Sequence, residues 1–239
     1  FLAGIAERGA DAVGYAHRFH GDAVSFLNHR SGASAFLPAL TVPASSVEVL
    51  LHVRDYTKGH PTIEANNHPV RHGHIVGVHN GIILNDEEIF ERHAIQRYVS
   101  SMTVDTEAIF ALVEGFGPWG KTLEQLRGSM ATAWVDERER GAVYLARGVG
   151  RPLWTGESRD GIFFASTKHA LEVSEEFLGL RLRKRELPEG TILTLESGRL
   201  ACKERFRPDR GFTERPLPAV RAPGERESCL RLLTALASI

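Results

Sequence analysis

Cysteine is scarce in this sequence: its 239 residues hold two, Cys202 and Cys229, both late in the chain. Two cysteines cannot make the several bridges of a disulfide framework, so a reduced, cytoplasmic setting is expected. An excess of one charge is lacking too, because 29 lysines and arginines nearly balance 30 aspartates and glutamates, for a net charge of −1. A nucleic-acid-binding surface normally needs a basic excess, and we expect no such partner.

Long apolar runs and a leader are also missing. No run approaches the ~18–20 apolar residues that cross a bilayer, so no membrane span is expected. The chain does not start with a charged-then-apolar leader that ends in a small-residue cleavage site. Instead, 42% hydrophobic and 25% charged residues give the ordinary mix of a soluble globular protein, with length for one large domain or two small ones.

Short apolar segments separated by turn signals predict the order of the elements. Strands are expected at 13–19, 23–29, 47–53, 74–84 (interrupted at His79-Asn80-Gly81), 131–136, 142–147, 161–165 and 191–195, with Gly21-Asp22 as a hairpin signal between the first two. Helices are expected at 1–7, from 85 or 86 to 93, from 105 or 106, at 121–127 and at 225–239. Strands, then helices, then more strands, joined too tightly for βαβ crossovers, predict an α+β protein.

The composition changes after Phe206. Residues 207–224 carry four of the 11 prolines and several arginines, which is typical of an extended linker. We therefore expect one domain over 1–206, followed by a linker and a C-terminal helix over 207–239.

Five small polar clusters stand at the ends of predicted elements, where functional sites usually lie. In chain order they are Arg8-Gly9-Ala10-Asp11, His52 to Gly59, Asn66-Asn67-His68-Pro69, Val78 to Ile83 and Val104-Asp105-Thr106-Glu107. Together and in this order they resemble the type 2 glutamine amidotransferase domain, an N-terminal-nucleophile hydrolase, and above all the glutaminase half of glucosamine-phosphate synthases. The likeness covers roughly residues 1–200, and the ordered set is far more specific than any one motif.

The resemblance implies a fold and a function. The expected fold is the four-layer αββα sandwich of the N-terminal-nucleophile hydrolases. The expected reaction hydrolyses the side-chain amide of L-glutamine, or a related γ-glutamyl amide, to glutamate and ammonia without a cofactor. An ammonia-accepting synthase and further copies of the chain stay open as partners. The alternative is a catalytically inactive glutamine-binding or scaffold domain of the same fold.

The resemblance assigns Asn80 and Gly81 as the oxyanion hole. Amide hydrolysis passes through a tetrahedral intermediate whose oxygen becomes negative, so donors must already point at that oxygen. Asn80 offers a side-chain NH₂ group, and Gly81 offers a backbone N–H that no side chain blocks. The alternative is a type I′ hairpin turn, for which Asn-Gly is the strongest short signal.

Three further residues are candidates for binding the glutamine backbone, and one for supporting it. Arg54 can grip the α-carboxylate with its planar fork, Thr57 can add a hydrogen bond, and Asp105 can take the α-ammonium group. The alternatives are a surface arginine at a strand end and a helix N-cap aspartate. His68 is expected to support the substrate loop, residues 54–59, and a hydrogen-bonded structural histidine is the alternative role.

Histidines are concentrated near these motifs, since six of the 11 fall between His52 and His79. No pair has the H-E-x-x-H spacing, and no nearby cysteine completes a structural zinc set. We therefore expect no metal site.

The sequence departs from the family in two ways. The family's nucleophile is a cysteine at residue one whose α-amine acts as base, and neither Cys202 nor Cys229 is expected to replace it. The first helix begins without a cap, so upstream residues that carry the nucleophile are expected. In the substrate loop, Asp55 stands where the synthases have tryptophan and Lys58 where they have histidine. An aspartate cannot form the apolar lid of an ammonia channel, which argues against channelling to an attached synthase.

Overall fold

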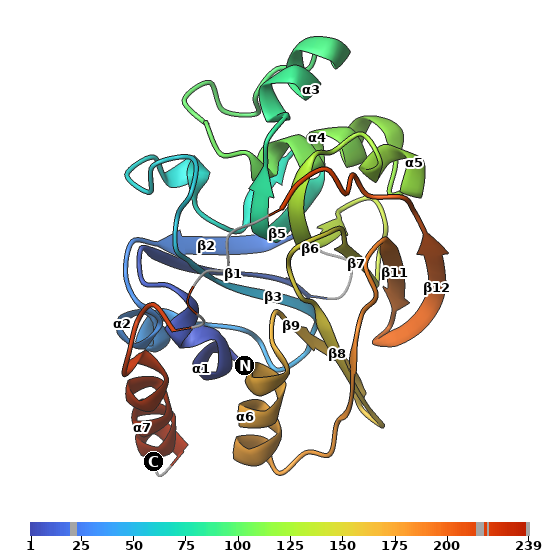
Figure 1. Cartoon of the computed structure of the whole chain (residues 1–239). Coiled ribbons are helices and arrows are strands. Elements are labelled where there is room, and N and C mark those ends of the chain that lie inside the picture. Colours follow the sequence, from blue (N-terminus) through green and yellow to red (C-terminus); the bar gives the residue numbers. More distant parts are fainter. Residues whose placement is uncertain (20–22, 214–217, 219, 238–239) are drawn as a thin grey trace.

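The computed structural model describes residues 1–19, 23–213, 218 and 220–237 (Figure 1). The strands are β1 (Ala12–Phe19), β2 (Ser25–His29), β3 (Ser46–Arg54), β4 (Val70–His72), β5 (Ile75–Ile83), β6 (Gly128–Asp136), β7 (Ala142–Arg147), β8 (Trp154–Ser158), β9 (Gly161–Ala165), β10 (Arg183–Glu186), β11 (Thr191–Glu196) and β12 (Arg199–Arg205). The α-helices are α1 (Leu2–Ile5), α2 (Ala33–Phe36), α3 (Asp86–His93), α4 (Thr106–Phe116), α5 (Gly120–Leu123), α6 (Lys168–Leu178) and α7 (Glu225–Ala237).

These elements form four layers. Two three-stranded sheets, β2-β1-β3 and β10-β8-β9, face a six-stranded sheet in the order β12-β11-β7-β6-β5-β4. Side chains of both layers, such as Leu50 and Val78, share the core between them. Helices α3, α4 and α5 cover the outer face of the six-stranded sheet, while α1, α2, α6 and α7 lie outside the smaller sheets (Figure 1). The predicted α+β fold and αββα sandwich are confirmed.

The expected interruption of the fourth strand is wrong. Strand β5 runs without a break through His79, Asn80 and Gly81, and these three residues pair with Thr132, Ala131 and Met130 of β6. The hairpin alternative for Asn80-Gly81 is therefore excluded. Both faces of β5 are covered, by α4 on one side and by the facing sheet on the other, so its sequence is an apolar run and does not alternate.

Two helices differ from the sequence predictions. Helix α5 ends at Leu123, because the chain turns there to enter β6 at Gly128. Helix α6 was not predicted, although Thr167 caps it through a bond from the Ala170 N–H at 3.2 Å. The Gly21-Asp22 hairpin lies outside the described residues. No helix within the described ranges is long and apolar enough to cross a membrane.

The C-terminal helix returns to the sandwich. Helix α7 lies against α1 and α2 (Figure 1), and Cys229 is fully buried in the core beneath them. Glu225, at the start of α7, accepts hydrogen bonds from the Ser34 N–H and hydroxyl at 2.8 and 2.9 Å. The segment predicted as a linker thus leads to a helix that packs on the same body.

Candidate active site

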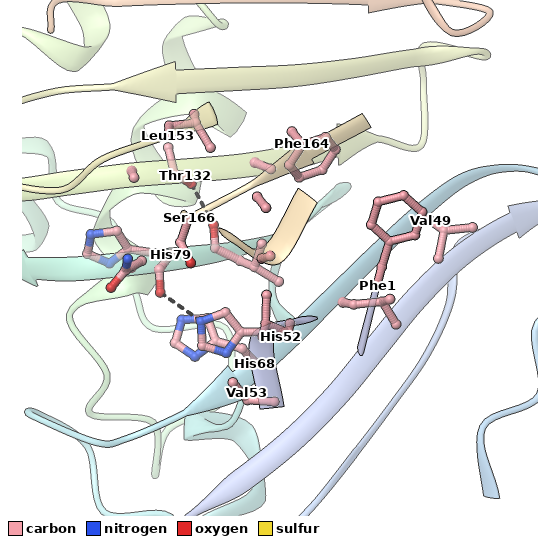
Figure 2. A pocket seen from close by; sticks show the side chains of 18 of the residues that line it. Phe1, Val49, His52, Val53, His68, His79, Thr132, Leu153, Phe164 and Ser166 are labelled. Atoms are coloured by element: carbon pink, nitrogen blue, oxygen red, sulfur yellow. Dashed lines mark hydrogen bonds between the residues drawn. The ribbon is translucent and has the colours of Figure 1, made fainter. Parts of the chain in front are cut away.

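A cavity of about 550 Å³ lies between the facing sheets. The six residues singled out from the sequence all line it: Arg54, Thr57, His68, Asn80, Gly81 and Asp105. Figure 2 shows a polar end with His52, His68 and His79, and an apolar end with Phe1 and Val49. The structure therefore brings four separate sequence motifs to one place.

Asn80 and Gly81 form a stretch of strand that tolerates little change. Gly81 has a φ of +146°, and a Cβ there would lie 2.0 Å from the Ser129 carbonyl oxygen and 2.6 Å from His79 Nε2. Only glycine fits this close approach. The Asn80 carboxamide has no hydrogen-bond partner within the part of the chain that the structure describes. Its donors are therefore available to a ligand in the cavity.

Arg54 is buried at the end of β3 and is not the surface arginine of the alternative interpretation. Its Nη1 donates to Asn67 Oδ1 at 2.8 Å, and its Nη2 donates to the carbonyl oxygens of Lys58 and Gly59 at 2.7 and 2.6 Å. Burial lowers the pKa of Arg54 to about 10, although Asp105 and Asp11 oppose the shift. Two N–H donors remain, one on Nε and one on Nη1.

The loop that Arg54 holds, residues 54–59, is here called the substrate loop. Thr57 lies on it and is exposed, as is Tyr56. The Tyr56 N–H donates to Asp11 Oδ2 at 3.0 Å, which links the loop to the first polar cluster. The loop is thus a surface segment held from several sides.

Asp105 directly precedes α4, but its side chain makes no capping bond. Instead its Oδ2 accepts the Ile83 N–H of β5 at 2.6 Å. Asp105 thus holds the N-cap position of α4, as the alternative predicts, but its side chain does not act as the cap. Its carboxylate is buried and lines the cavity together with Arg54.

Two histidines and a threonine form a hydrogen-bond chain, and the positions of its protons follow from the carbonyl oxygen at one end. His79 Nε2 lies 3.1 Å from the Ser129 carbonyl oxygen, which can only accept, so Nε2 carries the proton. His79 Nδ1 then accepts from the Thr106 hydroxyl at 3.0 Å. That hydroxyl has no second proton, so it accepts from His68 Nε2 at 3.0 Å. His68 is therefore hydrogen-bonded, as its structural alternative requires.

His52 lies against His68, with ring centroids 4.3 Å apart (Figure 2). Its Nε2 donates to the His79 carbonyl oxygen at 3.1 Å. Burial, reinforced by Arg54, lowers the pKa of His52 to about 3 and that of His68 well below its usual value. Both rings stay neutral near pH 7, and their Nδ1 atoms have no hydrogen-bond partner among the described residues.

His52, His79 and Thr106 stand inside the motifs but are not among the site residues that the resemblance implies. Their position inside those motifs was a sign of a role in the site. Their contacts with one another depend on the fold, so the sequence did not reveal them. No three histidine, cysteine, aspartate or glutamate side chains in the described ranges are arranged to hold a metal ion.

The apolar end of the cavity is bordered by two sheet edges. Within the described residues, β3 pairs only with β1, and β9 pairs only with β8. Val49 and Leu51 of β3 and Phe163 and Phe164 of β9 all line the cavity. Edge strands present unpaired N–H and C=O groups, so this end is a slot that an extended segment could occupy.

Neither cysteine lines the cavity. Cys202 is exposed on β12, and Cys229 is buried in α7. Burial raises the pKa of the Cys229 thiol to about 11, which keeps it protonated near pH 7.

Comparison with known proteins agrees with the geometry. A family model described as a glutamine amidotransferase domain matches residues 53–173, just over half of the chain. The chain belongs to this family. The matched region contains all six predicted site residues, and the predicted resemblance to type 2 glutamine amidotransferase domains is confirmed.

Curated relatives include enzymes named glutamine--fructose-6-phosphate aminotransferase [isomerizing]. The protein of Shigella flexneri is 38% identical over 140 residues, which cover 55% of this chain and 23% of that protein. The protein of Vibrio parahaemolyticus is 35% identical over 144 residues, with the same coverage. The match thus spans about a quarter of the length of these relatives.

Solved structures share the fold at low sequence identity. The glutamine phosphoribosylpyrophosphate amidotransferase from B. subtilis has a TM-score of 0.68 at 21% identity, covering 86% of this chain and 45% of that chain. A glutamine aminotransferase class-II domain protein from Silicibacter pomeroyi has a TM-score of 0.53 at 17% identity, covering 83% of this chain and 92% of that chain. These similarities support the fold.

Proposed function

We propose that this domain hydrolyses the side-chain amide of L-glutamine, or of a related γ-glutamyl amide, to glutamate and ammonia. The observation that carries the proposal is the position of Asn80 and Gly81 in an unbroken strand at the wall of the cavity, opposite the substrate loop. Strand β5 is covered on both faces and paired with β6, so it keeps donors in fixed positions, as stabilisation of a developing negative charge requires.

In this proposal, Asn80 and Gly81 donate to the oxygen of the tetrahedral intermediate. Gly81 supplies its backbone N–H, and Asn80 supplies its unpartnered carboxamide NH₂. Arg54 uses its two remaining donors for the α-carboxylate, with Thr57 adding a hydrogen bond. Asp105 takes the α-ammonium group with the carboxylate oxygen that Ile83 does not use. His68 supports the wall of the cavity formed by β5 through its hydrogen bond to Thr106, and it does not touch the substrate.

The nucleophile is proposed to be a cysteine thiolate on an extended segment outside these 239 residues. The slot between β3 and β9 supports this, because a strand placed there would lead to the polar end of the cavity. The α-amine of that cysteine takes the thiol proton, and the thiolate attacks the amide carbon. The C–N bond then breaks as the amine passes the proton to the leaving nitrogen, which departs as ammonia. Water then cleaves the thioester to give glutamate and regenerate the thiol.

The ammonia acceptor is proposed to be a separate synthase. Asp55 binds an arginine at the cavity mouth and so does not form the apolar lid that a channel would need. The names of the curated relatives describe whole enzymes, of which this chain matches about a quarter.

Calorimetry and an ammonia assay test the proposal together. The 239-residue chain should bind L-glutamine and release ammonia only at background. Protein that also carries the preceding segment should release ammonia, and thiol alkylation should abolish this release. Ammonia release that survives alkylation would rule out the thiol mechanism. Binding without release from the longer protein would favour the inactive glutamine-binding alternative.

A further inference from the structure

Both residues that depart from the family in the substrate loop form ion pairs with groups outside the loop. Asp55 pairs with Arg221, which precedes α7. Lys58 Nζ lies 2.5 Å from Asp86 Oδ2, at the start of α3. The loop is therefore held by charges from two directions, and a tryptophan at position 55 would carry no charge to pair with Arg221.

Arg221 lies on a backbone segment that is hydrogen-bonded to Glu7. Its own N–H and that of Ala222 donate to the Glu7 carbonyl oxygen at 2.8 and 3.2 Å. The Gly224 N–H donates to Glu7 Oε1 at 3.2 Å, and α7 then buries Cys229 in the core. Because the backbone is tied down at Arg221 and in the residues that follow it, the Arg221 side chain can restrain the loop instead of following it.

The Asp55–Arg221 pair lies at the mouth of the cavity. Both residues line the cavity, yet the side chains keep 34% and 22% of their surface exposed, so the pair borders solvent. Its removal would leave Tyr56 bound to Asp11 and Arg54 bound to the loop carbonyls. These other contacts would keep the basic shape of the loop if the pair were lost.

We propose that Arg221 is a positioning residue that latches the substrate loop through Asp55, so that the C-terminal segment sets the affinity for the substrate. The proposal rests on the proposed function, because it assumes that residues 54–59 cover bound glutamine. It also implies that a protein ending at Phe206, the domain boundary expected from composition, would lack part of its own site.

A double-mutant cycle measures the latch. The variants are Asp55→Asn, Arg221→Gln and both together, and the control is Arg231→Gln, which breaks an exposed pair with Glu227 on α7. Hydrogen exchange of the amides at 55–59 reports loop opening, and calorimetry reports L-glutamine affinity. Partly exposed ion pairs have small energies, so we expect about two- to five-fold faster exchange and weaker binding for each single variant.

The double variant should show the same change as each single variant, because the second substitution has no pair left to break. The control should match the parent. High salt should speed exchange in the parent more than in Arg221→Gln, since salt screens a pair only where it exists. Effects that multiply in the double variant, or parental exchange in Arg221→Gln, would overturn the latch. If the parent binds no glutamine, the proposed function fails, and exchange alone still decides whether the latch exists.

Discussion

The two walls of the polar end of the cavity are held in different ways. Strand β5 lies between two covered faces, and its residues pair along the whole of β6. The substrate loop has exposed residues, Tyr56 and Thr57, and is held by side chains that reach it from other elements. A backbone ladder fixes positions closely, whereas ion pairs near solvent are weak and adjustable. We infer that the strand serves the transition state and the loop serves substrate binding, and this contrast can be tested.

The largest effect is expected on the strand. Replacing Asn80 with alanine removes a donor that acts mainly in the transition state. In protein that carries the nucleophile segment, kcat should fall by about 10²–10³, while the glutamine affinity stays nearly parental. Steady-state kinetics and calorimetry on one preparation measure both. A parental kcat in folded Asn80→Ala protein would remove Asn80 from the oxyanion hole.

The next effect is expected on the loop, and there it should be one of affinity. Arg54→Lys keeps the charge but loses the planar fork that bonds Lys58, Gly59 and Asn67. Glutamine binding should weaken by about 1.5–3 kcal/mol, the range for a hydrogen bond to a charged group. The control is Arg92→Lys, which changes an exposed pair with Glu88 on α3. Equal affinity of Arg54→Lys and the parent would contradict the binding role.

Substitution of Thr106 tests whether the hydrogen-bond chain supports the cavity wall formed by β5. Thr106→Val removes the hydroxyl that joins His68 and His79 and leaves a buried N–H of His68 without an acceptor. Stability should fall by about 1–3 kcal/mol, and kcat should fall with little change in KM. Thr106→Ser keeps the hydroxyl and should restore both. If valine and serine give the same kcat, the histidine chain does not position the site.

The sequence predicted what is local and missed what is formed by pairing at a distance. Short apolar runs predicted an α+β protein, and the family resemblance carried by the ordered motifs implied the αββα sandwich and the six cavity residues. Strand β10 is Arg-Lys-Arg-Glu, with no apolar alternation, and exists because it pairs with β8. Arg221 lay in a segment with the composition of a linker, and only the packing of α7 brings it to Asp55. Asn80-Gly81 has the composition of a turn, and its pairing with β6 makes it a strand.

The last test of this end of the cavity is the pH dependence of its stability. Burial lowers the pKa of His52 from 6.5 to about 3 in the folded protein. Between these values the unfolded chain binds a proton that folded His52 does not, so the free energy of unfolding falls as the pH falls. This contribution is complete above pH 6.5 and is lost toward pH 3, at up to about 1.4 kcal/mol per pH unit.

His52→Gln keeps a donor for the His79 carbonyl oxygen but cannot titrate. Denaturant unfolding between pH 6 and 4 should therefore show a slope of the unfolding free energy against pH that is shallower by that amount. The substrate loop carries no histidine, so a change of its exposed, non-ionisable Thr57 to valine should leave the slope unchanged. A slope in His52→Gln equal to that of the parent would mean that folded His52 binds its proton in the same pH range as the unfolded chain, and that burial does not keep it neutral.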